Sequence, residues 1–95
     1  MSVVIVGGHD RMVRRYKDLC KEYQCSAKVF TQMRTGLRDL IGQPDLLVLF
    51  TSTMSHKMLR SALVDTRGGD TVVVRSHTSS MEALRGILDE HTARA

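Results

Sequence analysis

Residues 2–9 read SVVIVGGH, and this stretch decides the fold class. Its nearly continuous apolar run is typical of a parallel strand that is buried on both faces. The two glycines that follow indicate a tight turn, because glycine adopts backbone conformations that other residues avoid. Between Asp10 and Tyr23 the apolar residues recur at intervals of three, four and seven, which predicts a helix. The opening of the chain therefore predicts a strand, a glycine turn and a helix.

Three further pairs of strand and helix follow the first one. Apolar runs predict strands at residues 25–30, 45–51 and 71–74 and a short helix at 35–41. Two longer helices are also predicted, one capped by Thr53 or Ser55 and ended by Gly68-Gly69, the other capped by Ser79 or Ser80. We therefore predict an α/β fold: a single domain over residues 1–95 with a small four-stranded parallel sheet, flanking helices and the flavodoxin/Rossmann-like order 2-1-3-4.

Length and composition limit the kind of protein. The 95 residues, with 42% hydrophobic and 25% charged content, suit one globular domain. The apolar runs are far shorter than the roughly 18 residues of a membrane span, so we expect no membrane segment and a cytoplasmic location. Cys20 and Cys25 are then expected to be reduced structural thiols. Because so small a domain gains apolar burial from self-association, we also expect a homodimer.

The formal charge of +4 is compatible with an anionic ligand. The basic residues are spread through the predicted helices, however, and aromatic residues make up only 4% of the chain. Single-stranded nucleic acid is bound largely by aromatic stacking, for which this composition offers little material. We therefore expect a small ligand or cofactor as the partner, and no nucleic acid.

Histidines follow three of the four predicted strands. His9 comes after the first strand, His56 a few residues after the third and His77 after the fourth. The carboxyl ends of parallel strands meet at one edge of the sheet, where ligands of such folds bind. Imidazoles at that edge can ligate a metal or the iron of haem, although each of them can also be an ordinary solvent-facing loop residue. We expect His9 and His56 to be the ligands in preference to His77, which lies in an ordinary-looking polar turn.

The same predicted edge is rich in glycine and hydroxyl groups, which supports a different ligand. Backbone N–H groups and helix N-termini there can bind a phosphate or carboxylate, in a cradle made by Gly7, Gly8, Ser55, Arg75 and Ser76. The hydroxyls can equally be simple helix caps. The known phosphate-loop motifs are absent from residues 6–11, and a phosphorelay receiver is excluded because Phe50-Thr51-Ser52 offers no acceptor aspartate.

No catalytic group of residues emerges from the sequence. Ser55 and His56 are adjacent on a predicted helix, and successive helical side chains do not face each other as a nucleophile and its base must. Met12, Met54 and Met58 lie near the predicted edge, where thioethers can line an irregular apolar pocket or simply pack in the core. We therefore lean towards a binding protein rather than an enzyme.

Three segments of the chain resemble a bacterial family known as domain of unknown function 2325. They are residues 4–9 (VIVGGH), residues 55–58 (SHKM), and Arg75-Ser76 followed by residues 79–81 (SSM). The resemblance covers almost the whole chain and includes His9 and His56, whereas His77 stands where the family pattern has another small or polar residue. A cysteine that many members carry near residues 51–54 is missing here.

The resemblance implies haem binding. A haem site needs an apolar slot and an axial ligand, commonly histidine. We therefore expect a small haem-binding protein that holds the iron through His9 or His56 and serves in oxygen or other gas binding, sensing or haem handling. The alternatives are a module that binds a phosphate-containing or nucleotide ligand and an interaction subunit without any ligand.

Overall fold

The computed structural model describes residues 1–64 and 69–92. Within them, strands alternate with helices along the chain. The elements are β1 (Ser2–Gly7), a 3-10 turn η1 (Asp10–Met12), α1 (Val13–Glu22), β2 (Ser26–Phe30), α2 (Leu37–Ile41), β3 (Leu46–Phe50), a second 3-10 turn η2 (Thr51–Thr53), α3 (His56–Val64), β4 (Val72–Ser76) and α4 (Met81–His91).

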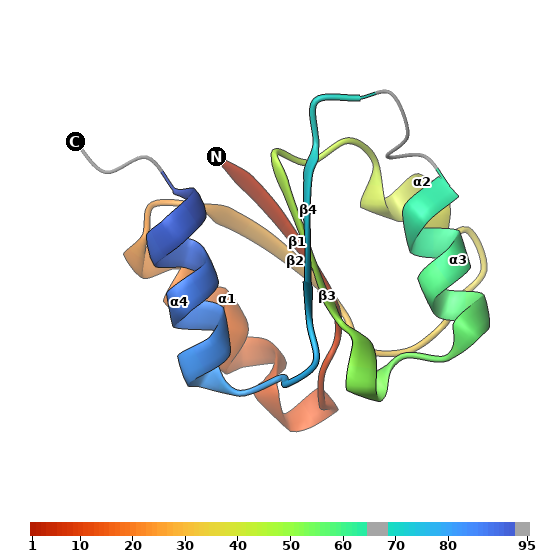
Figure 1. Cartoon of the computed structure of the whole chain (residues 1–95), viewed down its shortest axis with the longest axis horizontal. Helices are drawn as coiled ribbons and strands as arrows, with labels where there is room; N and C mark the ends of the chain where they lie inside the picture. Colours follow the sequence, from red (N-terminus) through yellow and green to blue (C-terminus); the bar gives the residue numbers. More distant parts are fainter. Residues whose placement is uncertain (65–68, 93–95) are drawn as a thin grey trace.

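The four strands form one sheet in the order β2-β1-β3-β4, and every neighbouring pair is parallel. Helices α1 and α4 cover one face of the sheet, while α2 and α3 cover the other (Figure 1). The predicted α/β fold with strand order 2-1-3-4 is therefore confirmed. The described helices include none that is both long and apolar enough to cross a membrane.

The core lies on both faces of the two central strands. All five residues of β3 are completely buried, as the continuous apolar run predicts. Because side chains alternate along a strand, Val3 and Ile5 pack with α1 and α4, whereas Val4 and Val6 pack with α2 and α3. Burial of each such side chain stabilises the fold by about 1.5 to 3 kcal/mol. The outer strands β2 and β4 are only partly covered.

The turn after β1 is packed too tightly for any residue but glycine. Gly7 and Gly8 have φ angles of +99° and +86°. A Cβ on Gly7 would lie 2.7 Å from the carbonyl oxygen of Phe50, and one on Gly8 would lie 2.7 Å from the ring of Tyr16. The N–H of Gly8 also donates to Oγ1 of Thr53 at 2.6 Å, so the turn is joined to the segment after β3.

The helix starts differ in detail from the expected ones. The first helix begins as a 3-10 turn, because the N–H of Met12 donates to the carbonyl of His9 at 2.8 Å. Ser55 Oγ accepts from the N–H of Met58 and so caps α3, whereas Thr53 is used by the glycine turn. The predicted end of this helix at Gly68 lies outside the described residues.

Two shorter elements also shift from their predicted bounds. The second helix starts at Leu37 rather than at residue 35, because Gly36 adopts a left-handed conformation immediately before it. Strand β4 continues to Ser76, since its polar end still pairs with Phe50 of β3. Ser80, one of the two caps expected for the last helix, accepts from the N–H of Ala83 at 3.1 Å.

We expect Gly8→Ala to lower the free energy of unfolding by about 2 to 3 kcal/mol, because left-handed strain adds to the clash with the buried Tyr16 ring. Gly36→Ala is the matched control. Its φ is +75°, but a Cβ there meets no atom within 4 Å, so only the backbone strain of about 1 kcal/mol is expected. Urea unfolding measures both variants, and equal losses would contradict the tight packing of the turn.

We expect Ser80→Ala to destabilise the protein by about 1 kcal/mol, because the first turn of α4 loses its capping hydroxyl. Ser79→Ala is the neighbouring control, since Ser79 caps no helix and its backbone carbonyl, which accepts from Tyr16, is kept in the variant. Its effect should stay within about 0.5 kcal/mol. Thermal unfolding distinguishes the two, and a larger loss for Ser79→Ala would argue against Ser80 as the cap.

Candidate functional site

The carboxyl ends of three strands form a level edge. Gly7 of β1 is opposite Phe50 of β3, which is opposite Ser76 of β4. His9 lies two residues beyond Gly7, and His77 directly follows Ser76. His56 begins α3, after the short turn that leaves β3. The predicted strand order therefore brings all three histidines to one edge of the sheet. This edge includes the boundary between β1 and β3, where the helices that follow the two strands lie on opposite faces of the sheet.

The three histidines divide between the two faces of the sheet. His9 and His77 precede α1 and α4 on one face, whereas His56 starts α3 on the other (Figure 1). Each is exposed, and none of the three imidazoles has a hydrogen-bond partner among the described residues. Within residues 1–64 and 69–92, no group of three or more His, Cys, Asp or Glu side chains is arranged to hold a metal ion. The edge thus offers separate single imidazoles.

Most other polar groups of the edge are bonded within the protein. The N–H of Gly8 is taken by Thr53, and the hydroxyl of Ser55 caps α3. Ser76 Oγ donates at 2.8 Å to a carbonyl two residues further along the chain. A phosphate cradle built from Gly8, Ser55 and Ser76 would have to compete with these internal bonds. Arg75 is exposed.

Tyr16 supports the edge from below the glycine turn. Its hydroxyl donates to the carbonyl of Ser79 at 2.7 Å, and its ring centroid lies 5.4 Å from that of Phe50. Burial raises the pKa of Tyr16, an effect that outweighs the opposing hydrogen bonds with the side chain of Ser79 and the backbone of His9. The phenol is therefore neutral at physiological pH and joins α1 to the segment before α4.

Asp10 ties a second pair of loops together at the same edge. Its carboxylate accepts hydrogen bonds from the hydroxyl of Thr31 and, at 2.8 Å, from the side-chain amide of Gln32. These bonds hold the start of the β2–α2 connection against the turn that carries His9. Neither Thr31 nor Gln32 stands out in the sequence, since the contact depends on β1 and β2 being neighbours.

The candidate methionines do not line a single pocket. Met12 packs against the core on the α1 and α4 side, whereas Met54 packs against the core on the α2 and α3 side. Met58 is only 2% exposed and belongs to the second core. The sheet therefore separates Met12 from the other two.

The two cysteines are free and buried. Burial, together with the neighbouring Cys25, raises the pKa of Cys20 to about 12. A thiol with so high a pKa stays protonated at neutral pH, and thiolate is the form that attacks electrophiles and binds metals. Cys20 is therefore a packing residue of the first core.

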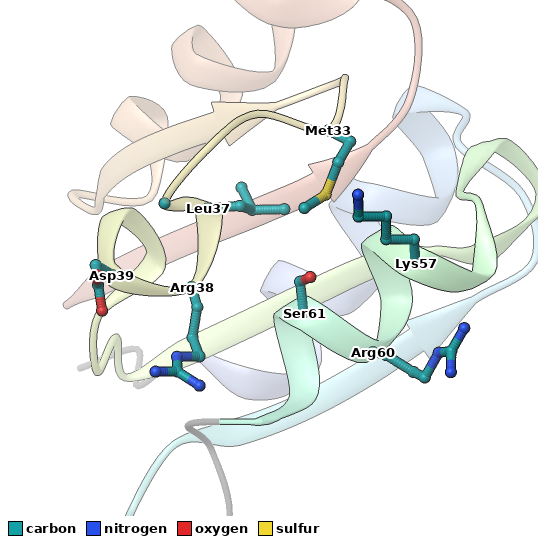
Figure 2. Close-up of a pocket in the computed structure, with 8 residues that line it drawn as sticks. Met33, Leu37, Arg38, Asp39, Lys57, Arg60 and Ser61 are labelled. Atoms are coloured by element: carbon teal, nitrogen blue, oxygen red, sulfur yellow. The ribbon is translucent and has the colours of Figure 1, made fainter.

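A groove between α2 and α3 was not singled out from the sequence. Its volume is about 500 Å³, and its lining residues are Met33, Gly36, Leu37, Arg38, Asp39, Lys57, Arg60 and Ser61 (Figure 2). The sequence does contain one indication of this groove, because Lys57, Arg60 and Ser61 have the spacing of residues on one helical face. The other wall comes from residues 33–39, and their position opposite α3 follows only from the fold.

Comparison with known proteins gives one family and no individual relative. No curated protein and no solved structure matches the chain significantly. A family model does match residues 2–91, which is nearly the whole sequence and includes the glycine turn, all three edge histidines and both walls of the α2–α3 groove. The chain therefore belongs to the bacterial family described as "uncharacterized protein conserved in bacteria", domain of unknown function 2325.

Proposed function

We propose that this protein binds haem through a histidine at the carboxyl edge of its sheet and serves in oxygen or other gas binding, sensing or haem handling. The observation that carries the proposal is the free state of the edge imidazoles. His9 and His56 are exposed and without hydrogen-bond partners among the described residues, while the neighbouring hydroxyls are bonded internally. The groups left available for a ligand are thus good donors to iron.

Separate imidazoles suit the binding of haem better than the binding of a bare metal ion. A protein site for a bare ion needs several side chains together, and the described residues contain no such group. Haem iron already has four porphyrin nitrogens and takes one or two axial ligands from the protein. The residues present therefore fit haem, with His9 or His56 as the axial ligand. When bound, the haem would supply the iron that binds oxygen or another gas.

A homodimer in the cytoplasm is part of the same proposal. Both candidate histidines are exposed in the single chain, so a haem bound there would have one face open to water. A second copy of the chain can cover that face and exclude solvent, because cofactor pockets usually enclose most of their ligand.

The test is a titration of the purified protein with hemin, followed by visible absorption. We expect a sharp Soret band that saturates at one haem per chain, or one per two chains if the cofactor lies at a dimer interface. Replacing the axial ligand by alanine should weaken binding about tenfold or more and change the band position. His9→Ala and His56→Ala are compared, and one of them should show this effect.

His91→Ala is the matched control, because His91 lies at the far end of α4, away from the carboxyl edge. It should bind hemin like the unmodified protein. A broad, non-saturating absorbance change in the unmodified protein would reject haem binding. Saturable binding that neither His9→Ala nor His56→Ala alters would reject the ligand assignment.

A further inference from the structure

The groove between α2 and α3 offers a ligand mainly polar and charged groups. The described residues that line it include two apolar side chains, Met33 and Leu37, and Leu37 is only 1% exposed. Figure 2 shows Lys57 and Ser61 on the side of α3 that faces these two residues. The volume of about 500 Å³ lies within the usual range of small-molecule sites. Size and lining together therefore favour a small hydrophilic ligand.

Positive charge exceeds negative charge among the groove residues. Three basic side chains, those of Arg38, Lys57 and Arg60, stand against the single carboxylate of Asp39. The chain as a whole has 14 basic and 10 acidic residues, so its positive excess is concentrated in the groove. Figure 2 shows Asp39 on the outer side of α2, directed away from α3. The space between the two helices therefore attracts anions.

The two cations of α3 are available to a ligand. Lys57 and Arg60 are exposed, and no carboxylate within residues 1–64 and 69–92 forms an ion pair with either of them. They are three positions apart, so they are neighbours on the surface of the helix. An ammonium group acts on a phosphate as a point charge, whereas a guanidinium group can donate two parallel hydrogen bonds to it.

Ser61 adds a hydroxyl group beside Lys57. The two residues are four positions apart and share one face of α3. A serine inside a helix often donates to the carbonyl four residues earlier. The half-buried hydroxyl of Ser61 has no hydrogen-bond partner in the part of the chain that the structure describes, whereas Ser55 and Ser76 at the carboxyl edge use theirs within the protein. Ser61 can therefore donate to a ligand without breaking an internal bond.

We propose that this groove binds a small phosphorylated compound, with a phosphoryl group held by Lys57 and Ser61 and with Arg60 adding positive charge at the outer rim. A phosphoryl group carries negative charge and several strong acceptor oxygens, so it can pair with the ammonium group and accept from the hydroxyl at the same time. The site is separate from the one proposed for haem, because its lining, among the described residues, includes no histidine.

The test is isothermal titration calorimetry of the purified protein with inorganic pyrophosphate and with ADP, in the absence of haem. We expect saturable binding of both compounds and none of adenosine, which lacks the phosphates. Replacing Lys57 and Arg60 together by alanine should weaken both compounds about tenfold, since two charge contacts with the anion are lost. Ser61→Ala keeps the charge of the groove and should weaken both about fivefold, through the loss of one hydrogen bond.

Lys17→Ala combined with Arg85→Ala is the matched control. It removes the same two positive charges from exposed positions on α1 and α4, which cover the other face of the sheet (Figure 1). Both affinities should stay unchanged, because exposed charges at that distance are screened by salt.

Four results would overturn the proposal. One is the absence of saturable binding of pyrophosphate and ADP to the unmodified protein, and another is adenosine binding as tight as that of ADP. Equal weakening in the two double variants would show that overall charge, and not the groove, attracts the anion. An unchanged affinity in Ser61→Ala would likewise leave charge alone as the cause. Hemin is absent from these titrations, so none of these results decides whether the protein binds haem.

Discussion

The packing of the Gly7-Gly8 turn against Phe50 and Tyr16 is the constraint on which the carboxyl edge depends. The turn can approach the end of β3 because Gly7 has no Cβ, and it can approach the ring of Tyr16 because Gly8 has none. This approach places the N–H of Gly8 on Thr53 and the ring of Tyr16 beneath the backbone that leads to His9. Tyr16 in turn holds the carbonyl of Ser79, so the turn also positions the segment before α4. Three of the four connections at this edge are thus linked through one glycine pair.

The sequence predicted those features that depend on local pattern. The apolar run of β3 corresponds to a strand buried on both faces, and Ser55 and Ser80 are capping residues as their positions before helices suggest. Strand order also followed from alternation, because right-handed crossovers leave few arrangements. The role of Thr53 was not predictable in the same way. Its hydroxyl bonds a residue 45 positions earlier in the chain, so a local pattern suggests only a helix cap.

In the candidate site, too, the features that depend on neighbouring residues were predictable, whereas those that depend on contacts between distant segments were not. Placement of His9, His56 and His77 at one edge needed only the positions of the strand ends, and it is what the structure has. Their separation onto opposite faces depends on which helix each connection joins. The groove between α2 and α3 was harder to predict from the sequence, because β3 separates the segments that form its two walls. Charged residues on one helix face usually mean a solvated surface, and the wall that lies opposite them is known only from the fold.

The exposure of both candidate ligands connects the haem and homodimer proposals. A porphyrin held by His9 or His56 of a single chain would leave one of its apolar faces in water. Exposed apolar surface forgoes about 25 cal/mol for each Å² that could be buried, so a half-covered macrocycle binds well below its potential. A second chain that covers this face would remove it from water. Haem binding and dimer formation would then reinforce each other, because each one completes the apolar surface that the other needs.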